Sequence, residues 1–230
     1  MLISVWSPKG GSGTSVFAAA LSIVLARRGP ARLADLAGDQ PAILGMSEPV
    51  AGLRNWLAVG PGAPAEAVER IAVEVCRGLT LLPTGPTRSV RVNPEAGAAL
   101  GVILREDPIP TVADLGTAPE GAVRAVGEVA DHSVVLIRGC YLALRRAVRH
   151  PLLDKANAVV LVEEPGRALR SREIADVLGV SVVARVPVRT GIARIVDAGV
   201  LPARLPEMLA NPAHRLLAHL GIGAREDRVA

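Results

Sequence analysis

Short apolar runs alternate along the chain with longer segments of helical periodicity. The runs that have the character of strands are Leu2–Trp6, Ala31–Leu36, Leu79–Leu82, Thr111–Leu115, Ser133–Ile137, Ala158–Val162 and Val180–Val186. They are continuously apolar, which is typical of strands buried on both faces of a parallel sheet. The pattern predicts an α/β fold with a doubly wound, mostly parallel sheet of about seven strands and helices on both faces.

Helical segments separate these runs. The predicted helices include Thr14–Arg28, Leu53–Leu57, Pro64–Val75 and Pro94–Arg105. Asn93 is the expected cap of the last of these helices, because a side-chain oxygen there can accept an N–H of the first turn. No internal repeat or low-complexity block is visible, so we expect a single domain over residues 1–230.

Composition excludes several classes of protein. Half of the residues are hydrophobic, which excludes global disorder, and aromatic residues make up 2%, which argues against a surface that stacks on bases. Two cysteines argue against a disulfide framework or a multi-cysteine metal site. The apolar start is too short for a signal peptide, and the longest apolar stretch, Val16–Ala26, is too short to span a bilayer. We expect a cytoplasmic protein, with a nucleoid-associated or polar position as options.

A glycine-rich loop, SPKGGSGTSV, lies between the first predicted strand and the first predicted helix. In that position, backbone N–H groups can converge on an anion at a helix N-terminus. The nucleotide-binding candidates are Lys9, Gly10, Gly11, Ser12, Gly13, Thr14 and Ser15, and the Ser15 hydroxyl is placed to reach Mg²⁺. The usual phosphate loop ends in G-K-[ST], but Thr14 stands here in place of that lysine. Lys9, one of only two lysines in the chain, lies at the other end of the loop.

The loop resembles the deviant Walker A motif of the ParA/MinD family, K-G-G-x-G-K-[ST], and departs from it at Thr14. The resemblance extends over essentially the whole chain. It implies that Lys9 reaches the phosphates of a partner protomer, that Asp35 is the first acid of the switch I segment, and that Asp114 holds Mg²⁺ through water. Ala37 replaces the second switch acid, and Asp39 follows closely as a candidate for its role. The catalytic candidates are therefore Lys9, Asp35 and Asp39.

The segment ARVPVRTGIARIVDAG resembles the family's border of the nucleotide base, which makes Pro187 a further binding candidate. Val162 stands where the family often has an adenine-reading Asn. The sequences of the loop and of the segment DLAGDQPAILG look most like those of stand-alone actinobacterial members of the CpaE/TadZ and septum-site-determining group. The receiver-like N-terminal domain of the CpaE/TadZ branch is not expected, since the loop begins at Ser7.

This resemblance implies a positioning or assembly factor for septum, chromosome or pilus localisation, with ATP and Mg²⁺ as cofactors. We expect a nucleotide-responsive homodimer that also binds a protein partner of a positioning or pilus system. Loss of the loop lysine and of the second switch acid favours weak or absent hydrolysis, so enzymatic activity stays undecided and an active protein would be a slow ATPase. The alternative is a degenerate pseudo-ATPase scaffold that does not bind nucleotide.

Two surface features have competing interpretations. Arg145, Arg146 and Arg149 lie in an arginine-rich stretch, and Arg145 and Arg149 are expected to share a helical face. They are candidates for nonspecific contacts with DNA phosphates, against the alternative of a solvated outer face. The C-terminal segment Asn211–Ile222 could resemble a membrane-binding helix, but it has one Arg and no aromatic anchor, so a packed helix is favoured and membrane binding is not expected.

Overall fold

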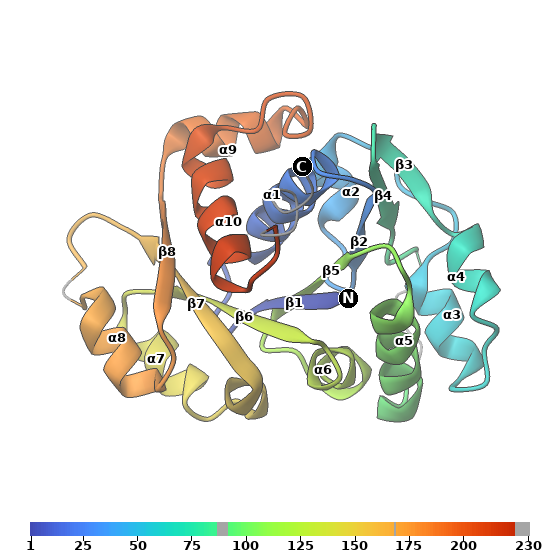
Figure 1. Cartoon of the computed structure of the whole chain (residues 1–230), viewed down its shortest axis with the longest axis horizontal. Helices are drawn as coiled ribbons and strands as arrows, with labels where there is room; N and C mark the ends of the chain where they lie inside the picture. Colours follow the sequence, from blue (N-terminus) through green and yellow to red (C-terminus); the bar gives the residue numbers. More distant parts are fainter. Residues whose placement is uncertain (87–91, 168, 224–230) are drawn as a thin grey trace, which may run out of the picture.

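The computed structural model describes residues 1–86, 92–167 and 169–223 (Figure 1). Its strands are β1 (Leu2–Ser7), β2 (Ala31–Asp35), β3 (Val73–Cys76), β4 (Leu79–Leu82), β5 (Thr111–Thr117), β6 (His132–Arg138), β7 (Ala156–Glu163) and β8 (Val182–Pro187). They form one eight-stranded sheet in the order β3-β4-β2-β5-β1-β6-β7-β8. Every neighbouring pair is parallel except β3 and β4. The predicted doubly wound α/β fold is confirmed, with one strand more than expected.

Helices cover both faces of this sheet. One face carries α1 (Thr14–Ala26), α2 (Gln40–Leu44), α9 (Thr190–Asp197) and α10 (Glu207–His219). The other carries α3 (Leu53–Val59), α4 (Glu66–Arg70), α5 (Pro94–Glu106), α6 (Gly121–Glu128), α7 (Tyr141–Ala147), the 3₁₀ helix η1 (Pro151–Lys155) and α8 (Ser171–Leu178). In Figure 1, α1 and α10 lie side by side on one side of the sheet, and α5 and α6 lie on the other.

The continuously apolar strands divide their side chains between two cores. In β1, Ile3 and Val5 belong to the core under α1, while Leu2 and Trp6 belong to the opposite core. Successive side chains of a strand point to opposite faces, so a strand covered on both sides must be apolar at consecutive positions. The same layering explains why the sequence shows no alternation of apolar and polar residues in these strands.

The predicted helix Pro64–Val75 is wrong over its second half. Helix α4 ends at Arg70, and Val73–Cys76 forms β3, the antiparallel edge strand. Arg77 and Gly78 make a two-residue turn into β4, and Gly78 adopts a left-handed φ of 83°. Glycine accepts that conformation without strain, and short loops of this kind set hairpin register. The hairpin therefore overrides the apolar periodicity that suggested a helix.

Two local predictions about helices hold. The Asn93 side chain caps α5 by accepting the N–H of Ala96 at 2.8 Å. Helix α10 buries Ala213, Leu216 and Leu217 in the core that α1 shares, as expected for a packed C-terminal helix. Within the described residues, no helix has the length and apolar character needed to cross a membrane.

Helices α5 and α6 approach so closely that the contact requires glycine. A Cβ atom on Gly97 would collide with the backbone carbonyl of Ala122. We expect Gly97→Ala to lower the free energy of unfolding by about 1–3 kcal/mol, because neither backbone can yield easily. Gly191→Ala is the matched control: Gly191 is exposed on α9 with open space around its Cβ position, so alanine should be neutral or stabilising. Chemical denaturation of both variants checks this, and equal effects would contradict it.

Candidate functional site

The carboxyl ends of β2, β5 and β1 meet at one edge of the sheet. These three strands are adjacent and parallel, and Asp35, the last residue of β2, pairs in register with Asp114 in the middle of β5. The glycine loop follows β1 directly. Ligands of open α/β sheets bind at this edge, because the loops there leave a crevice. The topology therefore brings the loop and both predicted strand-end acids together.

The glycine loop has the geometry of an anion cradle. Gly11 and Gly13 adopt left-handed φ angles of 72° and 75°. The carbonyl oxygen of Lys9 accepts hydrogen bonds from the hydroxyls of Ser7 at 3.1 Å and Ser12 at 2.7 Å, which fix the path of the loop. Helix α1 begins at Thr14 with no side chain capping its first turn. Its N-terminal N–H groups are therefore left for a bound anion.

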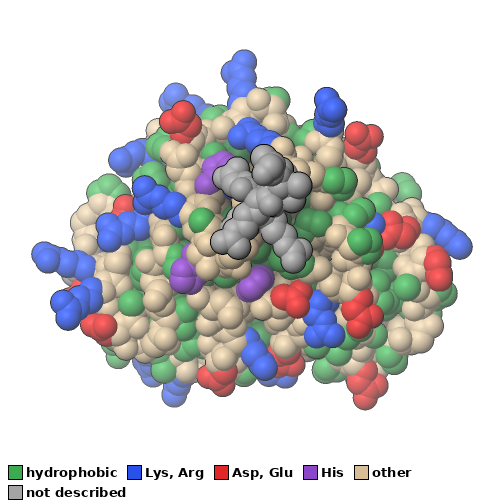
Figure 2. All heavy atoms as spheres, viewed as in Figure 1, with side chains coloured by type: hydrophobic (Ala, Val, Ile, Leu, Met, Phe, Trp, Pro, Cys, Tyr) green, Lys and Arg blue, Asp and Glu red, His purple; other side chains and the backbone are tan. Residues whose placement is uncertain are grey.

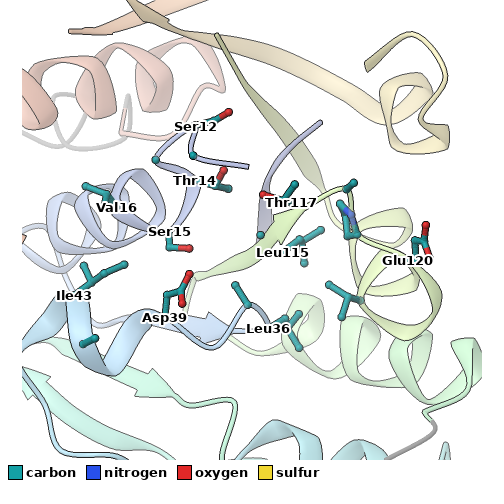
Figure 3. Close-up of a pocket in the computed structure, with 18 residues that line it drawn as sticks. Ser12, Thr14, Ser15, Val16, Leu36, Asp39, Ile43, Leu115, Thr117 and Glu120 are labelled. Atoms are coloured by element: carbon teal, nitrogen blue, oxygen red, sulfur yellow. The ribbon is translucent and has the colours of Figure 1, made fainter. Parts of the chain in front are cut away.

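A cleft of about 800 Å³ lies beside the loop. Figure 3 shows the Ser15 hydroxyl and the Asp39 carboxylate directed into it from α1 and from the segment before α2. The charged residues among those that line the cleft, within the described chain, are Asp39 and Glu120; none is Lys or Arg. A polyphosphate here would meet negative charge from the side chains and positive partial charge only from the loop and the helix terminus.

Asp114 lies beneath this cleft and is fully buried. Its Oδ1 accepts the N–H of Gly116 at 3.0 Å, and its Oδ2 accepts the amide N–H of Gln40 at 2.8 Å. Burial raises the pKa of Asp114 to about 6, against the opposing hydrogen bonds from Ser15 and Gln40, and the charge of Asp35 raises it further. The hydrogen bonds to Asp114 therefore do not fully offset the cost of burying its charge.

Asp35 is also buried but serves mainly the backbone. Its Oδ1 accepts N–H groups of Ala37 at 3.1 Å and Gly38 at 2.6 Å, and its Oδ2 accepts that of Gln40 at 3.3 Å. Burial raises its pKa, and these hydrogen bonds oppose the rise. Asp35 lines a separate hollow of about 440 Å³ rather than the main cleft. Its contacts make it the residue that shapes the segment between β2 and α2.

The donor set at the cleft fits a magnesium ion shared with a phosphate. Ser15 lies close enough to Asp114 for its hydroxyl to lower the pKa of that carboxyl, so a hydroxyl and a carboxylate are adjacent. Mg²⁺ prefers oxygen ligands and is commonly held by one or two carboxylates together with substrate phosphates and water. The described residues contain no group of three or more His, Cys, Asp or Glu side chains able to hold a metal alone. A cation here would complete its shell with water and with phosphate oxygens.

A second hollow, of about 290 Å³, lies on the other side of the loop. Gly11 and Gly13 line both cavities, and Pro187 and Val162 line this one among mostly apolar neighbours. Its size and character suit a planar base, while Val162 offers no amide to read that base. The predicted binding residue Pro187 therefore lies beside the glycine loop, at the end of β8.

Lys9 is half-buried and lies outside the lining of both cavities. It is near Glu164, which pairs with Arg138 at 3.1 Å and Arg167 at 2.7 Å. The hydrogen bond from Arg167 is the main cause of the lowered pKa of Glu164, and the charges of Arg138 and Lys9 add to it. The lysine expected at the loop thus adds its charge near the end of β7 rather than over the cleft of its own protomer.

The arginine candidates lie away from the cleft. Arg145 and Arg146 are exposed in the last turn of α7, and no ion pair in the described part of the chain involves them or Arg149. The helix ends at Ala147, and Arg149 lies in the turn that continues it, with its N–H bonded to the carbonyl of Arg146. Figure 2 shows Lys and Arg side chains more frequent toward the left of the view, where β8 and α8 lie.

Sequence reasoning gave no role to three residues at the site. Thr117 lines the cleft from the end of β5 and Glu120 from the segment after it, and Gln40 lies under the cleft with its side chain on Asp114. Gln40 directly follows Asp39, so position alone could have nominated it. Nothing in the sequence shows that its side chain would turn inward.

Several solved structures share this fold. A ParA family ATPase from Chlorobium tepidum superposes with a TM-score of 0.78 at 19% identity, covering 95% of this chain and 98% of that one. MinD from Pyrococcus horikoshii, complexed with Mg-ADP, gives 0.78 at 17% identity and 95% coverage of both chains. MinD from Aquifex aeolicus in a MinC:MinD complex gives 0.76 at 21% identity, covering 94% and 95%. The chain thus has the fold of ParA/MinD ATPases.

Sequence comparison adds a nearer but unassigned relative. An uncharacterized protein of Mycobacterium tuberculosis is 32% identical over 234 residues, which cover 95% of this chain. The matched part is 63% of that relative, so this chain spans less than two thirds of its length. No protein-family model matches the chain.

The raised pKa of Asp114 predicts a pH dependence of stability. The folded protein holds a proton on this carboxyl up to about pH 6, whereas the unfolded chain releases it near 3.8. Stability from this group is therefore present at low pH and is lost as the pH rises from about 4 to about 6. We expect the unfolding free energy of the native protein, relative to Asp114→Ala, to fall by about 1 kcal/mol between pH 5 and pH 7. Denaturation at both values measures it; a pH-independent difference would contradict it.

Proposed function

We propose that this chain is a nucleotide-responsive switch of the ParA/MinD type, with residues 1–230 as one nucleotide-binding domain. It acts as a homodimer with weak or absent ATP hydrolysis in septum, chromosome or pilus positioning. The observation that carries the proposal is the meeting of the glycine loop, Ser15 and Asp114 at one edge of a sheet with the ParA/MinD fold. The resemblance to stand-alone CpaE/TadZ and septum-site-determining proteins favours this role.

In this proposal the phosphates of the nucleotide occupy the cleft and its base occupies the second hollow. Backbone N–H groups of Gly10–Gly13 and the start of α1 hold the phosphates, and Pro187 borders the base. Ser15 and Asp114 hold Mg²⁺, the latter through water. The ion, when bound, neutralises phosphate charge that the cleft's own side chains do not neutralise. Because the lining carries two acids and no cation, nucleotide binding by the monomer depends strictly on the divalent ion.

Hydrolysis requires groups that this cleft supplies poorly. Thr14 replaces a lysine that would place a point charge on the β- and γ-phosphates. Ala37 replaces the second switch acid, and its Cβ faces Gly116 at the end of β5. Asp39 directs its carboxylate into the cleft and is the candidate to orient the attacking water (Figure 3). One acid without the loop lysine supports slow turnover at best.

A second protomer can supply the positive charge that the side chains lining the cleft lack. Lys9 lies outside its own cleft but on the same edge of the protomer, next to the loop. Facing a second copy, it supplies positive charge to the partner's phosphates, so nucleotide and dimer stabilise each other. The MinC:MinD complex of Aquifex aeolicus shows that a protein of this fold assembles with a protein partner. A partner from a positioning or pilus system would engage the dimer here.

Molecular mass with and without Mg-ATP tests the switch. We expect a shift from monomer to dimer with Mg-ATP or a non-hydrolysable analogue, measured by light scattering alongside calorimetric titration. Lys9→Ala should weaken nucleotide-dependent dimerisation by about tenfold or more, because one charge-assisted contact to phosphate is lost per site. Lys155→Ala is the matched control, since it removes the chain's other lysine, exposed in η1. Equal behaviour of the two variants would refute the trans contact.

A pseudo-ATPase scaffold is the second candidate, favoured by Thr14 and by the absence of any Lys or Arg from the cleft lining in the described chain. In that case the loop is structural and the protein assembles without nucleotide. No heat of binding at millimolar Mg-ATP, with an unchanged mass, would support this candidate over the switch.

Exposed arginines without ion pairs in the described chain support nonspecific DNA binding as a further part of the proposal. Neutralising Arg145 and Arg149 to Gln should weaken binding to random duplex DNA and lower the slope of log affinity against log salt by about 0.9 for each lost contact. Arg70→Gln with Arg77→Gln is the control, because both are exposed near the β3 edge at the other end of the sheet. Mobility shifts at several salt concentrations measure the slopes. Equal losses in both pairs would contradict the assignment.

A further inference from the structure

Gln40 is a fully buried amide that links three parts of the site. Its backbone N–H donates to Oδ2 of Asp35 at 3.3 Å, and its side-chain Nε2 donates to the carbonyl of Ser15 at 2.9 Å and to Oδ2 of Asp114 at 2.8 Å. A single residue at the start of α2 thus contacts the end of β2, the first turn of α1 and the middle of β5.

The orientation of this amide follows from its neighbours. Both groups next to Nε2 are acceptors, so the nitrogen must face them and the reverse orientation would set oxygen against oxygen. Oε1 is consequently left buried without a hydrogen-bond partner in the part of the chain that the structure describes. An unpaired buried acceptor costs about 1–3 kcal/mol, which offsets much of what the nitrogen's hydrogen bonds contribute. The orientation of the Gln40 carboxamide is therefore well defined, but its net contribution to the stability of the fold is small.

The amide of Gln40 and a water bound to the cation would compete for Oδ2 of Asp114. In the proposed function, water on the magnesium ion donates to Asp114, and Ser15 lies beside it. Nε2 of Gln40 is a neutral donor already on that carboxylate. A neutral N–H can be exchanged for water held by a cation at little electrostatic cost, and Oε1 gains hydration if the side chain turns out.

We propose that Gln40 is a reversible latch over the cation position, a positioning residue whose carboxamide occupies Asp114 until a hydrated divalent cation replaces it. The inference rests on the proposed function for the place of the cation. The latch ties cation binding to the switch segment, because the backbone N–H of Gln40 also holds Asp35. Asp39, the preceding residue, presents its carboxylate to the cleft, so release of the latch shifts that group (Figure 3).

The experiment measures the response to MgCl₂ alone, without nucleotide, against NaCl of equal ionic strength. Gln40→Met keeps the length of the side chain and removes the donor. We expect it to change the melting temperature of the metal-free protein little, because it removes the unpaired Oε1 together with the donor, and to lower the Mg²⁺ midpoint of thermal stabilisation by about tenfold, the equivalent of one hydrogen bond. Gln40→Ala is the second variant, should Met pack poorly.

Thr84→Val is the matched control, because it removes the 2.6 Å hydrogen bond from Thr84 to the carbonyl of Asp35 without contacting Asp114. It should lower the melting temperature and leave the Mg²⁺ midpoint unchanged. An unchanged or weaker midpoint in both Gln40 variants overturns the latch, as does a protein that MgCl₂ never stabilises. If the native protein still dimerises with Mg-ATP, only the latch has failed; if it responds to neither, the proposed function fails with it.

Discussion

Two carboxylates that the sheet places side by side govern this site. Asp35 and Asp114 pair in register on adjacent parallel strands, and both are buried, so each needs donors to offset the loss of water. Asp35 obtains them from the backbone of the segment after β2, which is thereby folded around it. Asp114 obtains fewer and keeps a pKa of about 6. The shape of the segment after β2 and the raised pKa of Asp114 both follow from this pairing.

The electrostatic balance of the cleft is the basis on which we propose a switch rather than an efficient catalyst. An anion cradle of backbone N–H groups lies beside acidic side chains, while the nearest lysine adds its charge near Glu164. Under the proposed function, a polyphosphate in this cleft would need positive charge from a divalent ion or from a second copy. Nucleotide binding would then depend on the ion or on the second copy. A switch between two states requires such a dependence, because a ligand shifts an equilibrium only if it binds the two states differently.

The sequence anticipated the fold where local rules and tertiary packing agree. Continuously apolar strands, the Asn93 cap and the loop between β1 and α1 all lie where the pattern put them, because each depends on residues close in sequence. It failed at Pro64–Val75, where pairing with β4 converts a helical pattern into an edge strand.

For the site, the sequence determined the chemical groups: a glycine loop lacking its lysine, a serine hydroxyl, and acids at two strand ends. These are local features, and strand ends of a parallel sheet converge by topology alone. Only the tertiary structure decided their balance. Gln40 meets Ser15 and Asp114, residues 25 and 74 positions away along the chain. Which donors reach a buried carboxylate, and which cations stay outside its cleft, depends on such distant contacts, and no local pattern encodes them.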